Sequence, residues 1–138
     1  MSTRRVSSTW EPGPLRCDVA AGVFTIPVDE PETDGGTGSA ATPTDLLLAS
    51  LASCFTLALV HSAMKQKVSL VRLRVDVVGH YAGRRFDTMQ ITVDAGGPNA
   101  DELAEMVRLA EGLCYVTNTL RASVDVDVVT LSRNAGGG

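Results

Sequence analysis

Three stretches of the chain alternate between apolar and polar residues, the pattern of a β-strand with one buried face. They are residues 71–77, 89–93 and 124–128. The first two flank a turn at Gly83-Arg84-Arg85, so together they predict a β-hairpin. The third stretch, Val124-Asp-Val-Asp-Val128, predicts a last strand near the end of the chain.

The N-terminal part of the chain predicts a small antiparallel meander within residues 1–30. Its strands are expected over 4–10, 15–20 and 23–28, separated by Glu-Pro-Gly-Pro (11–14) and by Ala21-Gly22. The following residues, 29–40, are polar and rich in turn formers, which predicts a loop. The loop contains Gly35-Gly-Thr-Gly38 but lacks the Gly-Lys-Ser/Thr ending of a phosphate-binding loop, so we expect no nucleotide there.

A long central helix is predicted over residues 43–65. Thr42 is a suitable N-cap, Pro43 suits the first helical position, and Asp45 would complete a capping box. Residues 46–60 are apolar nearly all round, which indicates burial on most faces rather than along one stripe. This run is shorter than the ~18–20 residues that span a bilayer, so we expect a core helix whose small residues allow a close neighbour, such as the same helix of a second subunit.

The C-terminal half predicts two further helices. Asn99 and Glu102 form a second capping-box pattern, and Gly112 suits the C-terminal cap of the helix that begins there. A short helix is expected from about Cys114 to about Arg121, before the last strand, and residues 133–138 are expected to form a flexible tail. The predicted order is therefore β-β-β-α-β-β-α-α-β.

Length and charge exclude several classes of protein. The 138 residues are most simply one domain, 1–138. The 12 basic and 16 acidic residues are scattered along the chain, which indicates neither nucleic-acid nor membrane binding. Three cysteines at irregular spacing do not suggest the disulfide framework of a secreted domain. The N-terminus lacks the apolar segment of a signal peptide, so we expect a cytoplasmic protein.

The candidate chemical groups are Cys17, Cys54, Cys114, His61 and His80. None of their spacings matches a metal site, so we expect no metal and no other cofactor. His61 follows Cys54 by seven residues on the same helical face and could assist a thiol, or it could be an ordinary solvated side chain. If the fold brings Cys54 and Cys114 together, thiol redox chemistry follows; otherwise they are ordinary buried residues.

Two motifs resemble one known family. Pro43-Thr-Asp-Leu-Leu-Leu-Ala-Ser-Leu-Ala-Ser-Cys54 is similar to the central-helix signature of the OsmC/Ohr family, and Glu111-Gly-Leu-Cys114-Tyr-Val-Thr-Asn resembles its second signature. The resemblance implies an α+β, OsmC-like fold and an intertwined homodimer with central buried helices and active sites at the subunit interface. It also implies that Cys54 is a peroxidatic and Cys114 a resolving cysteine for organic hydroperoxides, with a dithiol such as a lipoyl group as reductant.

Such chemistry needs a positive charge beside Cys54. A free thiol has a pKa of about 8.5 and is mostly protonated at neutral pH. The helix dipole cannot lower this pKa enough at Cys54, because its effect fades within the first turn. One guanidinium at ~4 Å would stabilise the thiolate by about 4 kcal/mol at an effective dielectric near 20. Peroxidases of the family carry an arginine in a Gly-Arg-x-Gly turn. Here that turn reads Glu-Pro-Gly-Pro-Leu-Arg16, which makes Arg16 the candidate for this charge. Arg16 could equally be an ordinary exposed arginine of a strand, in which case Arg4 and Arg5 are the next candidates.

A second departure from the family pattern concerns a glutamate ten residues before the first cysteine, where this chain has Thr44. Thr44 cannot be the carboxylate that orients an arginine. The alternative is therefore a non-peroxidatic dimer of the same family that binds a small apolar or thiol-reactive ligand. The two alternatives differ in whether Cys54 is a thiolate at neutral pH.

Overall fold

The structure is a computed structural model that describes residues 2–133. The N-terminal sheet is antiparallel in the order β1 (Ser7–Thr9), β2 (Arg16–Ala21), β3 (Phe24–Asp29). All three predicted strands are confirmed, although β1 is shorter than expected. The predicted loop after β3 contains one turn of 3-10 helix, η1 (Glu32–Asp34).

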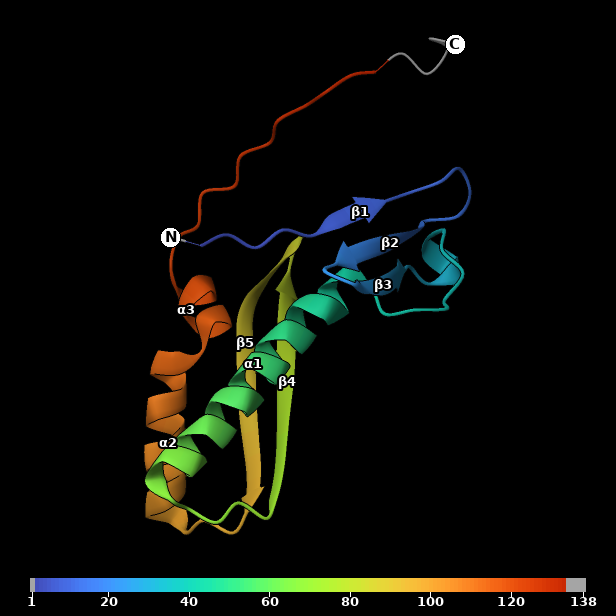
Figure 1. Ribbon diagram of the computed structural model, residues 1–138. Helices are drawn as coiled ribbons and strands as arrows, with labels where there is room; N and C mark the ends of the chain where they lie inside the picture. The colour runs from blue at the N-terminus through green and yellow to red at the C-terminus, as the bar shows by residue number, and fades with distance from the viewer. Residues whose placement is uncertain (1, 134–138) are drawn as a thin grey trace.

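Helix α1 (Pro43–Gln66) crosses the molecule as its central element (Figure 1). Its capping box forms as predicted: the Asp45 N–H donates to the Thr42 hydroxyl at 3.2 Å, and the Thr42 N–H donates to the Asp45 carboxylate at 3.1 Å. The helix ends at Lys67, which takes a left-handed conformation with φ of 58°. By length and composition alone α1 could span a membrane, but core helices of soluble proteins often have the same length and composition.

Strands β4 (Arg72–Ala82) and β5 (Arg85–Gly96) form the predicted hairpin, with both strands longer than the alternating stretches. The register pairs Val75 with Val93 and Val77 with Ile91, so the apolar residues share one face. This face packs against the core formed with α1, and the alternate residues are exposed. The hairpin lies behind α1 in Figure 1.

Helices α2 (Ala100–Leu113) and α3 (Tyr115–Arg121) lie beside α1. The capping box of Asn99 and Glu102 is confirmed. The prediction that Gly112 caps α2 is wrong, because the helix continues through Gly112 and the Cys114 N–H still donates to the Ala110 carbonyl at 2.9 Å. The chain changes direction at Cys114 instead, whose extended ψ of 107° separates α2 from α3.

The hydrophobic core lies between α1 and α2, with the hairpin closing it. Its fully buried residues include Leu59 from α1 and Met106 from α2, both 0% exposed. Small residues such as Ala63 and Ala110 let the two helices approach closely. Cys114 belongs to the same cluster, and Cys54 packs against it.

The last strand predicted at 124–128 does not form within the described residues. The chain leaves α3 and extends away from the other elements (Figure 1), and Val126 and Val128 are 83% and 85% exposed. A strand needs a neighbouring strand for its hydrogen bonds, and no strand of this chain lies beside the segment. Most of the predicted tail, residues 134–138, lies outside the described residues.

Candidate active site

Cys114 sits at the junction of α2 and α3 and is completely buried. Its backbone geometry makes it the N-cap of α3, so its side chain occupies the place of a capping hydroxyl. The Thr117 backbone N–H donates a hydrogen bond to the Cys114 sulfur at 3.4 Å. The sequence therefore places a sulfur where a backbone donor can stabilise its negative charge.

Cys54 lies near the middle of α1 and is half-buried against the same cluster. Burial raises the pKa of the Cys114 thiol, but Thr117, the Val116 backbone N–H and the Cys54 thiol outweigh burial and bring that pKa below its ordinary value. Cys54 and Cys114 therefore share one packed cluster, and no disulfide joins them.

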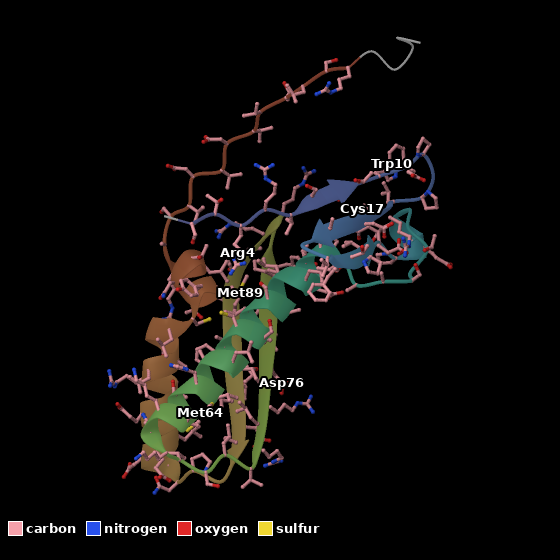
Figure 2. The ribbon with its side chains drawn as sticks, in the orientation of Figure 1. Arg4, Trp10, Cys17, Met64, Asp76 and Met89 are labelled. Atoms are coloured by element: carbon pink, nitrogen blue, oxygen red, sulfur yellow. The ribbon has the colours of Figure 1, made fainter. Side chains whose placement is uncertain are left out.

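A cavity of about 280 Å³ lies between α1, α3 and the start of β5, and neither Cys54 nor Cys114 is among its lining residues. Leu51, three residues before Cys54 and on the same side of α1, lines it, as does Thr117, which binds the Cys114 sulfur. The other lining residues are Phe86, Asp87, Thr88, Met89, Ile91, Leu120 and Arg121. Figure 2 labels Met89 on β5. Five of these nine lining residues are apolar, and Asp87, Thr88, Thr117 and Arg121 are polar or charged.

Arg16 lies elsewhere, at the start of β2 in the N-terminal sheet. Its guanidinium is held by Asp18 at 3.4 Å, by the Ser39 hydroxyl at 3.3 Å and by the buried Asp29 carboxylate at 3.9 Å. It lines a separate cavity of about 250 Å³ near Pro43, the first residue of α1. Since Cys54 follows Pro43 by eleven residues, about 16 Å of helix separates them. Within one chain, Arg16 is not beside Cys54.

The other sequence candidates also lie outside the thiol pair. Cys17 is in β2 of the N-terminal sheet (Figure 2), and His61 and His80 are exposed. Thr44 accepts a hydrogen bond from the Tyr81 hydroxyl at 3.0 Å and carries no charge toward either cysteine. Within residues 2–133, no three His, Cys, Asp or Glu side chains come close enough to hold a metal ion.

Sequence reasoning missed Thr117 and the cavity. Thr117 falls inside the second motif, three residues after Cys114, which is the position whose backbone N–H reaches an N-cap side chain. That spacing could have indicated its contact with the sulfur. The cavity could not be predicted in this way, because its walls come from three elements far apart in the sequence.

The comparisons with known proteins agree on one family. The sequence model described as OsmC-like protein matches residues 36–129. No curated protein matches the chain at a significant level. Among solved structures, an OsmC-like protein from Mycoplasma pneumoniae superposes with a TM-score of 0.75 at 19% identity, over 87% of this chain and 88% of that one.

Two further structures are more similar in sequence. An organic hydroperoxide resistance protein OsmC from Legionella pneumophila gives a TM-score of 0.62 at 25% identity, over 91% of this chain and 93% of that one. A protein assigned as an organic hydroperoxide resistance protein from Vibrio cholerae gives a TM-score of 0.62 at 27% identity, over 91% of this chain and 90% of that one. With the family match covering more than half of the chain, and the same fold in these structures, the protein belongs to the OsmC-like protein family.

Proposed function

We propose that this protein is a thiol-dependent peroxidase that reduces organic hydroperoxides through Cys54 and Cys114. The observation that supports the proposal is that Cys54 and Cys114, from distant parts of the chain, belong to one packed cluster, and that Thr117, whose backbone N–H binds the Cys114 sulfur, lines a cavity. The Legionella relative is named for organic hydroperoxide resistance, and the Vibrio cholerae protein is described with captopril bound in one of its active sites. Both descriptions support a family site for small organic molecules.

The burial of the two thiols supports different roles for them. Cys54 is partly exposed and is the thiol that a substrate can reach, whereas Cys114 is completely buried. Cys54 attacks the peroxide, Cys54–SH and ROOH giving Cys54–SOH and ROH. Cys114 then attacks this sulfenic acid, which forms the disulfide and releases water. The lowered pKa of Cys114 favours its thiolate for this second step.

The disulfide must be reduced before the next turnover. A dithiol, such as a lipoyl group, reduces it by thiol–disulfide exchange through a mixed disulfide and is itself oxidised to a disulfide. This reductant fits the cytoplasm, where cysteines are kept reduced. We place the protein there.

The working unit in this proposal is a homodimer. Apolar residues of α1 remain uncovered in the single chain, among them Leu57 at 69% and Met64 at 74% exposed, and the valines of 124–128 have no neighbouring strand. A second copy would cover both surfaces. It would also let Arg16 approach Cys54 of the other subunit and supply the positive charge that the thiolate requires.

A second candidate function is a dimer of the same family that binds a small apolar or thiol-reactive ligand without turnover. The observation that favours it is the placement of Arg16, which is paired with Asp18 and Asp29, together with Thr44 in place of the family's glutamate. In this alternative no positive charge activates Cys54. The cavity then holds a ligand, and the cysteines react only slowly.

Peroxide consumption separates the two candidates. Purified protein is mixed with cumene hydroperoxide and dihydrolipoamide, and loss of peroxide is followed beside Cys54→Ser and Cys17→Ser variants. The peroxidase proposal expects catalytic turnover that Cys54→Ser abolishes and that Cys17→Ser, a change in the N-terminal sheet, leaves intact. Absence of turnover in the wild-type protein would favour the binding protein.

A further inference from the structure

Cys114 is completely buried, and no acidic or basic side chain is among the groups that act on its pKa. Of the elements around it, α1 presents Cys54, and the hairpin presents apolar residues such as Met89. The charged residues nearest in the sequence, Glu111 of α2 and Arg121 of α3, pair with each other at the surface at 2.9 Å. A thiolate at Cys114 therefore depends on hydrogen bonds for its stability.

Thr117 offers Cys114 two donors. It is 4% exposed, and its backbone N–H donates to the Cys114 sulfur at 3.4 Å. Its hydroxyl also acts on the Cys114 thiol and lowers the pKa of that thiol, although no hydrogen bond of ordinary distance and angle joins the two. Among the described residues, this hydroxyl oxygen is the one buried side-chain oxygen or nitrogen without a hydrogen-bond partner. Buried polar groups normally have a partner, so this one calls for an explanation.

The ionised form of Cys114 provides the explanation. A thiolate accepts a hydrogen bond more strongly than a neutral thiol, because hydrogen bonds to a charged group are roughly twice as strong as neutral ones. A hydroxyl proton can rotate toward the acceptor that is near. No other acceptor binds the Thr117 hydroxyl, whereas the hydroxyl of Thr119 in the same helix already binds the Tyr115 carbonyl at 2.7 Å. The Thr117 hydroxyl is thus available to the thiolate.

We propose that Thr117 is a positioning residue whose hydroxyl donates to the Cys114 thiolate and so stabilises the attacking form of Cys114 in the disulfide-forming step. This inference rests on the proposed peroxidase function. In that step the Cys114 thiolate attacks the sulfur of the Cys54 sulfenic acid, so that the S–S bond forms and the S–O bond breaks. The hydroxide that leaves takes up a proton and becomes water.

The expected signature lies in the pH dependence of this step. Loss of the hydroxyl lowers the thiolate fraction of Cys114 about tenfold at pH values below its pKa, because one hydrogen bond to the charged form is lost. Each thiolate that remains is more nucleophilic, since nucleophilicity rises with the pKa of the thiol, and this offsets about half of the effect on a logarithmic scale. The step should therefore slow about threefold at low pH and not at high pH.

A titration tests the contact without any peroxide. When Cys17→Ser and Cys54→Ser are combined, Cys114 is the one thiol of the chain, and its ionisation is followed by the ultraviolet absorbance of the thiolate. The added variants are Thr117→Val, which keeps the shape and the backbone N–H, Thr117→Ser, which keeps the hydroxyl, and the exposed Thr119→Val as control. We expect Thr117→Val alone to raise the titration midpoint of Cys114. An unchanged midpoint would overturn the inference.

Single-turnover kinetics tests the step itself in proteins that keep all three cysteines. Reduced protein is mixed with one equivalent of cumene hydroperoxide between about pH 5 and about pH 10, quenched with acid and alkylated, and sulfenic acid and disulfide are followed by mass spectrometry. We expect Thr117→Val to oxidise Cys54 at the wild-type rate, and to form the disulfide about threefold more slowly at low pH only.

Two results would contradict different parts of the account. Equal slowing of disulfide formation at every pH would indicate a displaced Cys114 rather than a less stable thiolate, and it would overturn the inference. A wild-type protein whose thiols all stay reduced would instead overturn the peroxidase proposal, and the titration would then still decide whether the Thr117 hydroxyl stabilises the Cys114 thiolate.

Discussion

Asp29, the last residue of β3, holds the loop that leads into α1. Its buried carboxylate accepts hydrogen bonds from the backbone N–H groups of Glu30, Thr37 and Ser39 at 2.8, 2.9 and 3.0 Å, and from the Thr37 and Ser39 hydroxyls. The Thr37 side chain is the largest of the causes that place the pKa of Asp29 well below its usual value, against the opposing effect of burial. The carboxylate also fixes Arg16.

This lowered pKa makes the stability of the fold depend on pH. The contribution of Asp29 is present above the pKa of about 4 in the unfolded chain, and it is lost as the pH falls toward the lower pKa of the folded state. We expect Asp29→Asn to lower the midpoint temperature of unfolding by several degrees at pH 7, and we expect the difference from the wild-type midpoint to be smaller at pH 3. Thermal unfolding at both pH values measures this, with the exposed Asp18→Asn as control. A constant difference from wild type would contradict the expectation.

Arg16 is the candidate for the thiolate-stabilising charge in the proposed dimer. Arg16→Ala should slow peroxide reduction at pH 7 about tenfold or more, from loss of thiolate and of oxyanion stabilisation together. Arg74→Ala is the matched control, because Arg74 contacts Asp76 on the exposed face of β4. Stopped-flow kinetics provides the measurement. An unchanged rate would mean that another residue, with Arg4 or Arg5 first to be tested, supplies the charge.

Cys54 and Cys114 could be singled out from the sequence because each lies in a compact motif with its own spacing, and their roles stay predictions. The environment of Arg16 could not, because its partners Asp29 and Ser39 come from a loop with no periodic pattern.

Two glycines have opposite structural roles in the hairpin and in α2. A Cβ on Gly79 of β4 would lie 2.8 Å from the Phe86 ring and 3.1 Å from a Leu48 methyl, whereas a Cβ on Gly112 of α2 would meet nothing within 4 Å. Phe86 also packs against Tyr81, with ring centroids 4.4 Å apart, and lines the cavity between α1, α3 and β5. Gly79 thus allows the ring to form the cavity wall.

We expect Gly79→Ala to lower the free energy of unfolding by about 1 kcal/mol or more and to slow the reaction with bulky hydroperoxides, because the ring moves into the cavity. Gly112→Ala should raise the free energy of unfolding by about 0.5–1 kcal/mol, since alanine loses less backbone entropy in a helix. Chemical denaturation measures both changes. Equal effects of the two substitutions would refute this explanation of their roles.

Helix starts were predictable from sequence because their signals are local. Both capping boxes formed at Thr42 and Asn99, whose partners lie three residues away. The end of α2 was mispredicted because Gly112 looks like a cap, while Cys114 changes the chain direction without a left-handed residue. The segment 124–128 alternates like a strand, yet a strand also requires a neighbour that its sequence does not specify.

The exposed apolar surface of the single chain argues for an obligate dimer. Only 33% of the most apolar 18-residue stretch of α1 is buried, and the valines of 124–128 are exposed. We expect sedimentation to give a dimer at micromolar concentration, and deletion of residues 122–138 to weaken the dimer without leaving folded subunits. A stable, folded monomer at that concentration would contradict this expectation.

Peroxide chemistry at the thiol pair is tested most directly by mass spectrometry of the oxidised protein. Fully reduced protein receives one equivalent of cumene hydroperoxide, is alkylated and digested, and its cysteine peptides are identified. The proposed mechanism predicts a Cys54–Cys114 disulfide with Cys17 still reduced, and a Cys54 sulfenic acid in the Cys114→Ser variant. A disulfide that contains Cys17, or three thiols that all remain reduced, would contradict it.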